Sequence, residues 1–438
     1  MQIIVLMFLA IILFGGFLLS LPISSRTGTW TSYLSSVFTA TSATCVTGLT
    51  LFDTYTHWSG FGQVVILLLI QVGGLGFMTI ASMFFLLANR KIGIKQRVLM
   101  AQSLGVDQLS GIVRLVTHVL VRTAIIEGAG ALILTVRFCF LVPFDRALWW
   151  GVFHSVSAFC NAGFDIVGAV DVGGSLIPFV GDWVVSLTII LLITVGGLGF
   201  FVWEDIFRHW RQPRSLSLYT KMVLLLTGAL IVGGALFFLA VEWDNPATLG
   251  EMPLWKKILN GFFQSVTLRT AGFDSIGQGG LRDSSLAMSC ILMLIGGSSG
   301  STAGGLKTAT VGILLLTIRA TLAGRSEVTL RGRAISHSRV MDAMTLTMIV
   351  LILFLAGSMV ISVADGEAFL PAAFETASAM GTVGVTTGIT PGLSAFSHVF
   401  LITMMFLGRV GIMSFSVAFL ARSRPAKLKY PTVEFMVG

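Results

Sequence analysis

Four short segments interrupt this otherwise hydrophobic chain, and each of them ends on a glycine that is followed by an apolar residue. The glycines are Gly48, Gly163, Gly272 and Gly384, separated by 115, 109 and 112 residues. Aligned on the glycine, the segments read FTATSATCVTGL, FHSVSAFCNAGF, FFQSVTLRTAGF and FETASAMGTVGV. A fixed internal period indicates one structural unit copied along the chain. The sequence therefore predicts a unit of about 110 residues repeated four times, with function expected where the copies meet.

The composition indicates what surrounds these segments. Hydrophobic residues make up 55% of the 438 residues and charged residues only 11%, which is typical of a protein that crosses a membrane several times. A helix needs about 20 apolar residues to span the hydrocarbon core. Two stretches of roughly that length flank each glycine segment, which gives eight in all: 3–20, 64–87, 116–142, 184–203, 223–241, 286–318, 344–364 and 399–421.

Each glycine segment also follows a short stretch of expected helix. The predicted fold class is therefore an all-α integral membrane protein, a fourfold pseudo-symmetric repeat of helix, pore loop and helix with eight transmembrane helices and four re-entrant pore loops. The expected boundaries are 1–88 for repeat 1, 89–207 for repeat 2 with its preceding cytoplasmic link, 208–318 for repeat 3, 319–421 for repeat 4 and 422–438 for a cytoplasmic C-terminal tail.

Basic residues gather in the links between the repeats and in the tail. Of the 28 lysines and arginines, 18 lie in four segments: 90–114, 208–221, 319–339 and 422–429. Because the cytoplasmic loops of membrane proteins carry the excess of positive charge, we expect both termini in the cytoplasm and the glycine segments entering from the outside. This topology accounts for the net charge of +8, and no nucleic-acid-binding motif accompanies it.

Irregular backbone within a membrane is tolerated only where protein surrounds it or where it lines a water-filled cavity. Four converging loops would meet this condition by turning their carbonyl groups onto a shared cation, as rings of backbone carbonyls do in potassium-selective pores. One isolated glycine of this kind would be a turn or a helix contact, whereas four in register favour the pore. The candidate ion-binding residues are Val46, Thr47, Gly48, Asn161, Ala162, Gly163, Thr270, Ala271, Gly272, Thr382, Val383 and Gly384.

In these glycine segments and paired apolar stretches the chain resembles the Ktr/Trk/HKT superfamily of potassium transporters, and without extra helices at either end it is most similar to the Ktr-type membrane subunit. The resemblance covers nearly all 438 residues, although only the central glycine of the usual potassium-channel signature recurs. It implies a homodimer with one pore per subunit and a cytosolic regulatory ring that binds nucleotide. It also implies K+ as the transported ion, Na+ as a candidate second ion, a bacterial plasma (inner) membrane location and no organic cofactor.

The second apolar stretch of the third repeat contains the run GGSSGSTAGG, followed by Lys307. Each glycine costs a helix about 1 kcal/mol relative to alanine, so we expect a broken helix whose polar loop lies below the filter. In the resembled family this intramembrane loop acts as a gate. The candidate gate residues are therefore Gly296, Gly297, Ser298, Ser299, Gly300, Ser301, Thr302, Ala303, Gly304 and Gly305.

Arg409 occupies the place where the other repeats have Gly74, Gly197 and Gly297. An arginine at mid-membrane costs at least about 2.5 kcal/mol, so its side chain should face the pore or a buried acid such as Glu375. In the resembled family the arginine at this place lines the pore and opposes cation passage, which adds Arg409 to the candidate gate. The glycines of the corresponding motifs in the first two repeats are expected to pack helices closely.

Other charged residues near the loops have alternative interpretations. Glu127 and Glu375 are expected to be structural partners of hydroxyls, amides or the arginine just described, unless they tune ion occupancy. Arg269 is expected to form a salt bridge at the outer mouth, with Asp274 as its partner. Asp165 and Asp274 lie two residues beyond their glycines, where they would either concentrate cations or cap the loops.

Together these features predict potassium uptake across the plasma membrane through a channel-like pore with a four-loop carbonyl filter and an intramembrane gating loop. The alternative is an alternating-access secondary transporter, whose inverted repeats would each hold several spans. A membrane-embedded enzyme would need a paired-aspartate dyad or an HExxH helix, and the apolar stretches contain neither. We therefore expect a transporter and not an enzyme.

Overall fold

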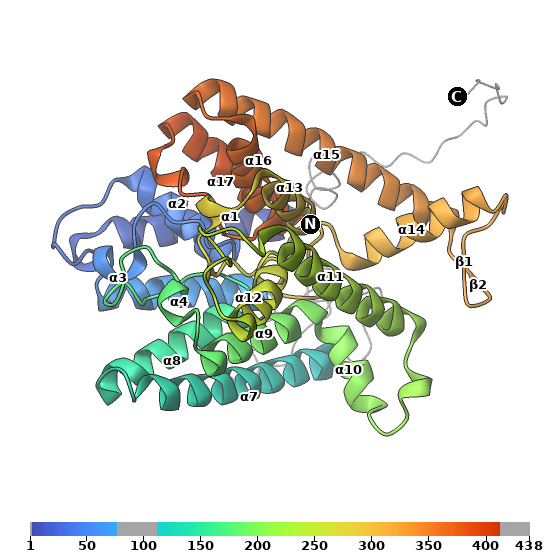
Figure 1. The fold of residues 1–438 in the computed structure, drawn as a ribbon, viewed down its shortest axis with the longest axis horizontal. Coiled ribbons are helices and arrows are strands. Elements are labelled where there is room, and N and C mark those ends of the chain that lie inside the picture. The colour runs from blue at the N-terminus through green and yellow to red at the C-terminus, as the bar shows by residue number, and fades with distance from the viewer. Residues whose placement is uncertain (1, 77–111, 412–438) are drawn as a thin grey trace.

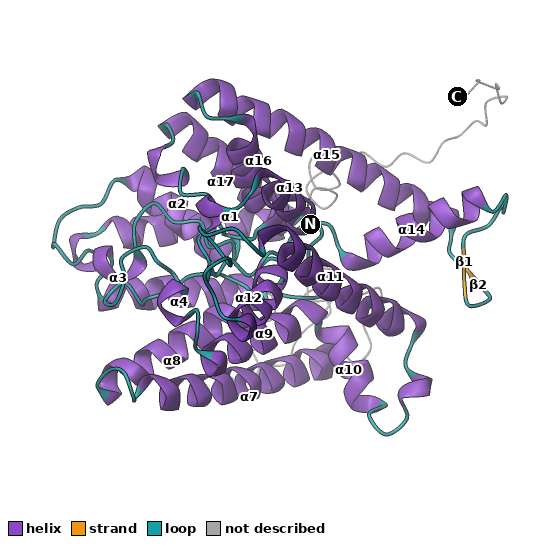
Figure 2. Ribbon diagram, viewed as in Figure 1, coloured by secondary structure: helices purple, strands orange, loops and turns teal. Residues whose placement is uncertain are grey.

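The computed structural model describes residues 2–76 and 112–411, and within these ranges nearly all regular structure is helical (Figure 2). One two-stranded hairpin is the exception. The helices and strands are α1 (Gln2–Ser20), α2 (Tyr33–Thr44), α3 (Thr54–His57), α4 (Gly60–Leu75), α7 (Ile112–Phe138), α8 (Phe144–Phe159), α9 (Trp183–Leu198), α10 (Phe200–Arg208), α11 (Leu218–Glu242), α12 (Leu254–Thr267), α13 (Asp283–Leu294), α14 (Thr308–Leu322), β1 (Thr329–Leu330), β2 (Arg333–Ala334), α15 (His337–Asp365), α16 (Phe369–Gly381) and α17 (Ala395–Val410).

The helices surround a central group of loops. Helices α7 and α8 lie side by side along one edge of the molecule, and α15, α16 and α17 lie along the opposite edge (Figure 1). Between these groups the loops gather in the middle of the view (Figure 2). The short helices α2, α8, α12 and α16 each end a few residues before one of the four glycines, and the sequence predicts a short helix ahead of each of them.

Among residues 2–76 and 112–411, three helices are long and apolar enough to cross a membrane, namely Val116–Phe138, Leu218–Glu242 and His337–Asp365. In their most apolar windows only 28%, 28% and 22% of the residues are buried, so most of these apolar side chains are left for lipid. Helices α9 and α10 add a fourth span if they are counted together, and five shorter apolar helices accompany them. The chain is thus a multi-pass helical membrane protein, and the full set of eight spans stays a prediction.

One predicted span is wrong as a single helix. The stretch 184–203 breaks at Gly199, where α9 and α10 are bent by 95° relative to each other. Gly199 has a φ of +89°, a conformation that residues with a side chain rarely adopt. The same kind of glycine ends α4 at Gly76 and α17 at Gly411, with φ values of +81° and +87°. The predicted continuations at 77–87 and 412–421, and the basic segments 90–111 and 422–429, lie outside the described residues.

The first glycine of each of these motifs packs its helix closely, as expected for α4 and α9. A Cβ at each of them would overlap a backbone carbonyl in the last turn of the short helix that precedes the nearest glycine segment. The pairs are Gly73 with Thr44, Gly196 with Phe159 and Gly408 with Met380. This contact seats each second helix directly against the base of its own glycine segment.

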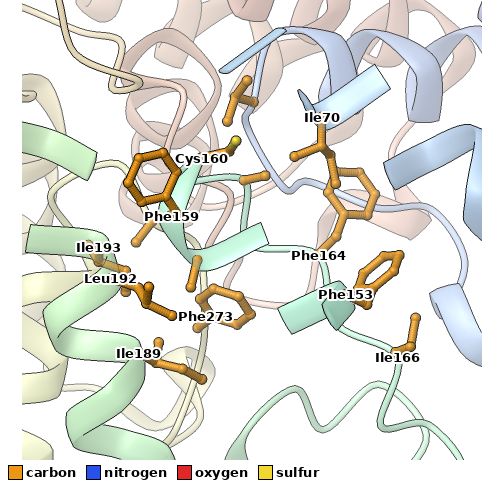
Figure 3. Packing of buried hydrophobic residues seen from close by; sticks show 14 of the residues in the cluster. Ile70, Phe153, Phe159, Cys160, Phe164, Ile166, Ile189, Leu192, Ile193 and Phe273 are labelled. Carbon is orange, nitrogen blue, oxygen red and sulfur yellow. The ribbon is translucent and has the colours of Figure 1, made fainter. Parts of the chain in front are cut away.

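Buried aromatic and aliphatic side chains anchor the loops from behind. Phe159 and Phe164, on either side of Gly163, lie in one core cluster with Ile70 of α4 and Ile193 of α9 (Figure 3). Phe273 of the third glycine segment belongs to the same cluster. A second cluster includes the side chains that flank the first and fourth glycines. Packing therefore fixes the loops from outside the ring that they form.

The close approach at Gly196 predicts a specific loss of stability. Gly196→Val should destabilise the protein by roughly 1–3 kcal/mol, because the added side chain displaces either the end of α8 or the loop beside it. Thermal unfolding of the detergent-purified protein measures this loss. The matched control is Gly228→Val on α11, where an added Cβ meets nothing within 4 Å. Equal unfolding temperatures for the two variants would contradict the assigned contact.

Candidate ion pore and gate

The four glycine segments share one backbone conformation. The residue two positions before each glycine has a positive φ although it is not glycine: Val46 at +57°, Asn161 at +60°, Thr270 at +71° and Thr382 at +52°. The glycines themselves follow at φ values of +103°, +66°, +88° and +99°. Such conformations cost energy for residues with a side chain and persist where the surroundings impose them. The sequence places these four residues in the candidate filter but does not predict their positive φ, because the four side chains have little in common.

The loops also contact one another in a closed cycle. A Cβ added to each glycine would meet the carbonyl oxygen of the residue just before the glycine in the next loop. In chain order, Gly48 faces Ala162 at 2.6 Å, Gly163 faces Ala271 at 2.7 Å, Gly272 faces Val383, and Gly384 faces Thr47. Since the fourth loop returns to the first, the four segments enclose one axis. Any side chain at these glycines would collide with a neighbouring loop.

Hydroxyl groups from the short helices hold each loop in place. Two of them accept hydrogen bonds from the amides of the segment glycines, and the other two donate to the carbonyl of the residue after the glycine. The pairs are Ser42 with Gly48 at 3.0 Å, Ser378 with Gly384 at 3.0 Å, Ser157 with Phe164 at 2.7 Å and Thr267 with Phe273 at 2.6 Å. In contrast, the buried hydroxyls of Thr44, Thr47 and Thr382 have no hydrogen-bond partner among the described residues.

The apolar stretch 286–318 is broken where the sequence predicts. Helix α13 ends at Leu294 and α14 begins at Thr308. The stem of the intervening loop is closed by the Gly296 amide, which donates to Leu306 O at 2.9 Å, and by the Leu306 amide, which donates to Leu294 O at 3.0 Å. Ser298 and Thr302 in the loop are buried despite their hydroxyl groups. The loop is thus an ordered element within the protein.

This loop rests against the end of α9. The Ser298 amide donates to Gly197 O at 3.0 Å, and the Phe200 amide donates to Gly300 O at 2.8 Å. The Phe200 amide is available for this second bond because the helix breaks at Gly199, so it does not bond to a carbonyl of α9. On its other side the loop approaches the fourth glycine segment, where a Cβ on Gly304 would overlap the side chain of Thr382. The loop therefore lies between the end of α9 and the fourth glycine segment.

Arg409 contacts backbone carbonyls instead of an acid. Its guanidinium donates to Thr302 O in the loop, and to Gly73 O and Gly74 O at the end of α4, the last at 3.1 Å. The C-terminal end of a helix carries partial negative charge, which favours a cation there. The alternative of an ion pair with Glu375 is wrong, because that carboxylate is occupied elsewhere.

Glu375 and Glu127 are structural partners of polar groups, as expected. Glu375 accepts from the Thr386 hydroxyl at 2.8 Å and from the Thr387 amide at 2.8 Å, and Thr390 donates to its second oxygen. Glu127 accepts from Gln71 Nε2 at 3.1 Å. These acids therefore secure the segment after the fourth glycine and the contact between α4 and α7.

The predicted salt bridge between Arg269 and Asp274 is wrong. Arg269 Nη2 donates to Gly296 O and to Thr308 Oγ1, both at 3.3 Å, which places this side chain at the stem of the broken helix. Asp274 accepts the amides of Gly277 at 3.0 Å and Gln278 at 3.1 Å and so caps its own loop. The two residues are close in sequence, but one precedes Gly272 and the other follows it, and their side chains bind different segments of the chain.

Asp165 is the other acid two residues beyond a segment glycine, and its carboxyl lies close to a second acid, Asp53. Burial and the nearby charge of Asp53 raise the pKa of the Asp165 carboxyl to about 7. Asp53 is held in place because it accepts the Thr56 amide at 2.7 Å and the Gly173 amide at 3.0 Å. The loop after the second filter segment therefore contains a carboxyl that exchanges its proton near neutral pH.

The raised pKa predicts pH-dependent stability. The folded protein holds the Asp165 proton up to about pH 7, whereas an unfolded aspartate loses it near about pH 3.9. Stability should therefore fall as the pH rises between these values and level off above them. Unfolding temperatures at about pH 5 and about pH 8 should differ less in Asp165→Asn than in the unaltered protein. Asp171→Asn, at an exposed acid of the same loop, should keep the full difference; loss of the difference in this control would contradict the assignment.

Comparison with known proteins identifies the family. Residues 3–427 match the TrkH family, described as "Cation transport protein". The chain is 40% identical to the potassium/sodium uptake protein NtpJ of Enterococcus hirae, over 100% of this chain and 97% of that protein. It is 37% identical to the Ktr system potassium uptake protein B of Bacillus subtilis, over 100% of this chain and 96% of that one.

The fold has a solved counterpart. The crystal structure of the potassium transporter TrkH from Vibrio parahaemolyticus superimposes with a TM-score of 0.70, covering 94% of this chain and 84% of that one at 18% identity. This likeness shows the fold, while the family match and the identity to the relatives span nearly the whole chain. The chain belongs to the TrkH/Ktr family of cation transport proteins.

Proposed function

We propose that this protein takes up potassium through a pore on the axis enclosed by the four glycine segments. The observation that carries the proposal is the closed cycle in which each filter glycine faces a carbonyl oxygen of the next loop. A ring of this kind concentrates partially negative oxygen atoms on one axis, and such rings replace the hydration shell of a potassium ion. The filter comprises the three-residue segments 46–48, 161–163, 270–272 and 382–384.

Two further features support cation binding here. The short helices α2, α8, α12 and α16 end at the loops, so the negative ends of their dipoles favour a cation next to the ring. The unpartnered hydroxyls of Thr47 and Thr382 supply additional oxygen atoms at buried positions. Potassium is the ion named for both relatives, and sodium is named for one of them, which makes sodium the candidate second ion.

The gate in this proposal is the loop 296–305 together with Arg409. The loop lies between Gly197 and the filter residue Thr382, and the guanidinium ties Thr302 to the end of α4. A fixed positive charge beneath the filter repels an approaching cation. Since Arg409 is bonded to carbonyl oxygens and not to an acid, its charge is not neutralised by a counter-ion. Movement of the loop would release these contacts and open the path.

The wider assembly is also part of the proposal. We propose a fourfold repeat with the boundaries given above, filter loops entering from the outside and both termini in the cytoplasm of a bacterial cell. The shared φ pattern of the four loops supports the repeat, and the basic links support the topology. The resemblance to Ktr-type subunits supports a homodimer and a cytosolic nucleotide-binding ring as partners.

The filter proposal predicts different effects at two glycines with similar backbone conformations. Gly384 and Gly76 have φ values of +99° and +81°, but only at Gly384 would an added Cβ collide with another loop. Gly384→Ser should therefore weaken the affinity of potassium uptake by about tenfold or more and reduce discrimination against sodium. Gly76→Ser should have a much smaller effect. Rubidium-isotope uptake by a potassium-uptake-deficient bacterium, with and without sodium, measures both; equal losses would refute the filter assignment.

The gate proposal predicts a gain of flux. Deleting 298–303 removes the loop from beneath the filter, and Arg409→Ala removes the positive charge, so both should raise basal potassium flux in proteoliposomes. The deletion should also make flux less dependent on a purified cytosolic partner. Arg282→Ala, at an exposed arginine beside α13, is the control and should leave flux unchanged. A deletion variant that assembles but retains low and fully partner-dependent flux would show that the loop is not the gate.

A further inference from the structure

A cavity outside the pore lies where the end of α14 meets the β hairpin. Its volume is about 500 Å³, and its lining includes Leu316 and Arg319 of α14, Arg325 of the connecting turn and Arg331 at the tip of the hairpin. The hairpin projects from the body of the molecule beside α14 (Figure 1). Nothing in the proposed pore or gate uses this cavity.

An apolar groove continues from the cavity along the membrane helices. It has a volume of about 210 Å³ and runs between α11 and α14, where Met222, Leu225, Leu226 and Leu315 line it. Leu316, Leu330 and Arg331 line both the groove and the cavity, so the two spaces adjoin. The result is one site with a charged head and an apolar tail.

The head of this site is strongly basic. Arg319, Arg325 and Arg331 line the cavity, and Lys221 borders the groove, whereas none of the described residues that line either space is acidic. Within 2–76 and 112–411, none of the three arginine side chains forms a salt bridge or hydrogen bond. The surrounding segment 319–339 has five basic residues and a single acid, Glu327. The unpaired charges call for an anionic occupant.

The tail of the site faces lipid. Leu225 and Leu315 in the groove are 73% and 52% exposed, and Leu322 at the end of α14 is 84% exposed. Such exposure of large apolar side chains along a membrane helix is favourable only in hydrocarbon. Because α11 begins and α14 ends beside this groove, the arginines lie at the level of the lipid headgroups.

We propose that the cavity and groove together bind one anionic phospholipid. The phosphate lies among Arg319, Arg325 and Arg331, whose guanidinium groups match phosphate oxygens, and an acyl chain lies along the groove between α11 and α14. A free phosphate would use the arginines but leave the groove uncovered, whereas the lipid fills both. The site adds a lipid requirement to the protein and is independent of the pore and its gate.

Lipid binding to the detergent-purified full chain tests the proposal. Phosphatidylglycerol, phosphatidylcholine and inorganic phosphate are titrated separately, with bound lipid measured by native mass spectrometry and by the shift in unfolding temperature. Each arginine near a phosphate is worth about fivefold in affinity, so the combined change Arg319→Gln, Arg325→Gln and Arg331→Gln should weaken phosphatidylglycerol binding by about a hundredfold. Phosphatidylcholine should bind weakly to both proteins. Replacing the same three residues by lysine should retain most of the binding.

The matched control changes three exposed arginines of the α10–α11 link, namely Arg208→Gln, Arg211→Gln and Arg214→Gln, with the same loss of charge. It should bind phosphatidylglycerol as the unaltered protein does. Equal weakening in both triple variants, or competition by inorganic phosphate as strong as that by the lipid, would overturn the proposal. So would unchanged lipid binding together with altered association of a second copy or a cytosolic partner, because the groove would then dock protein. Since binding is measured without transport, failure of the pore proposal would not affect this result.

Discussion

Contact between successive loops is the constraint on which the rest of the structure depends. Irregular backbone at membrane depth must be enclosed by protein, and here each loop is enclosed by the next one in the cycle. The hydroxyls of Ser42 and Ser378 and the aromatic side chains behind the loops complete this enclosure. The close-packed glycines of the second helices, such as Gly196, then follow as a requirement, because a larger residue would push the helix off the base of the loop.

The ionisable groups near the ring follow a common rule. The cations Arg269, Lys307 and Arg409 donate to backbone carbonyls, while the acid Glu375 accepts from hydroxyls and an amide. Positive and negative groups are thus each satisfied by neutral dipoles and do not pair with one another. A buried ion pair would neutralise both partners, whereas hydrogen bonds to dipoles leave the formal charge in place. The positive field below the ring is therefore set by the guanidinium groups of Arg269 and Arg409.

Much of this organisation can be predicted from the sequence, because it depends on spacing. Four glycines in register predict four loops, and the run beginning at Gly296 predicts the break between α13 and α14. The direction in which a side chain points cannot be predicted from spacing. Proximity along the chain suggests Asp274 as the partner of Arg269, but it does not reveal which segment the Arg269 side chain faces. The sequence does not predict the break at Gly199, because the carbonyl that accepts the Phe200 amide there, Gly300 O, comes from a distant part of the chain.

The ring is built from one polypeptide, and this has a consequence for how such a protein can change over time. The four loops must match in backbone path, yet their side chains differ, as Val46, Asn161, Thr270 and Thr382 show. In an assembly of identical subunits, any substitution would appear four times around the axis. In a single chain, one helix pair can carry a broken helix and another pair can carry an arginine, while the other parts of the ring keep their own residues. Each of the four loops can therefore change separately, while the axis that they share is preserved.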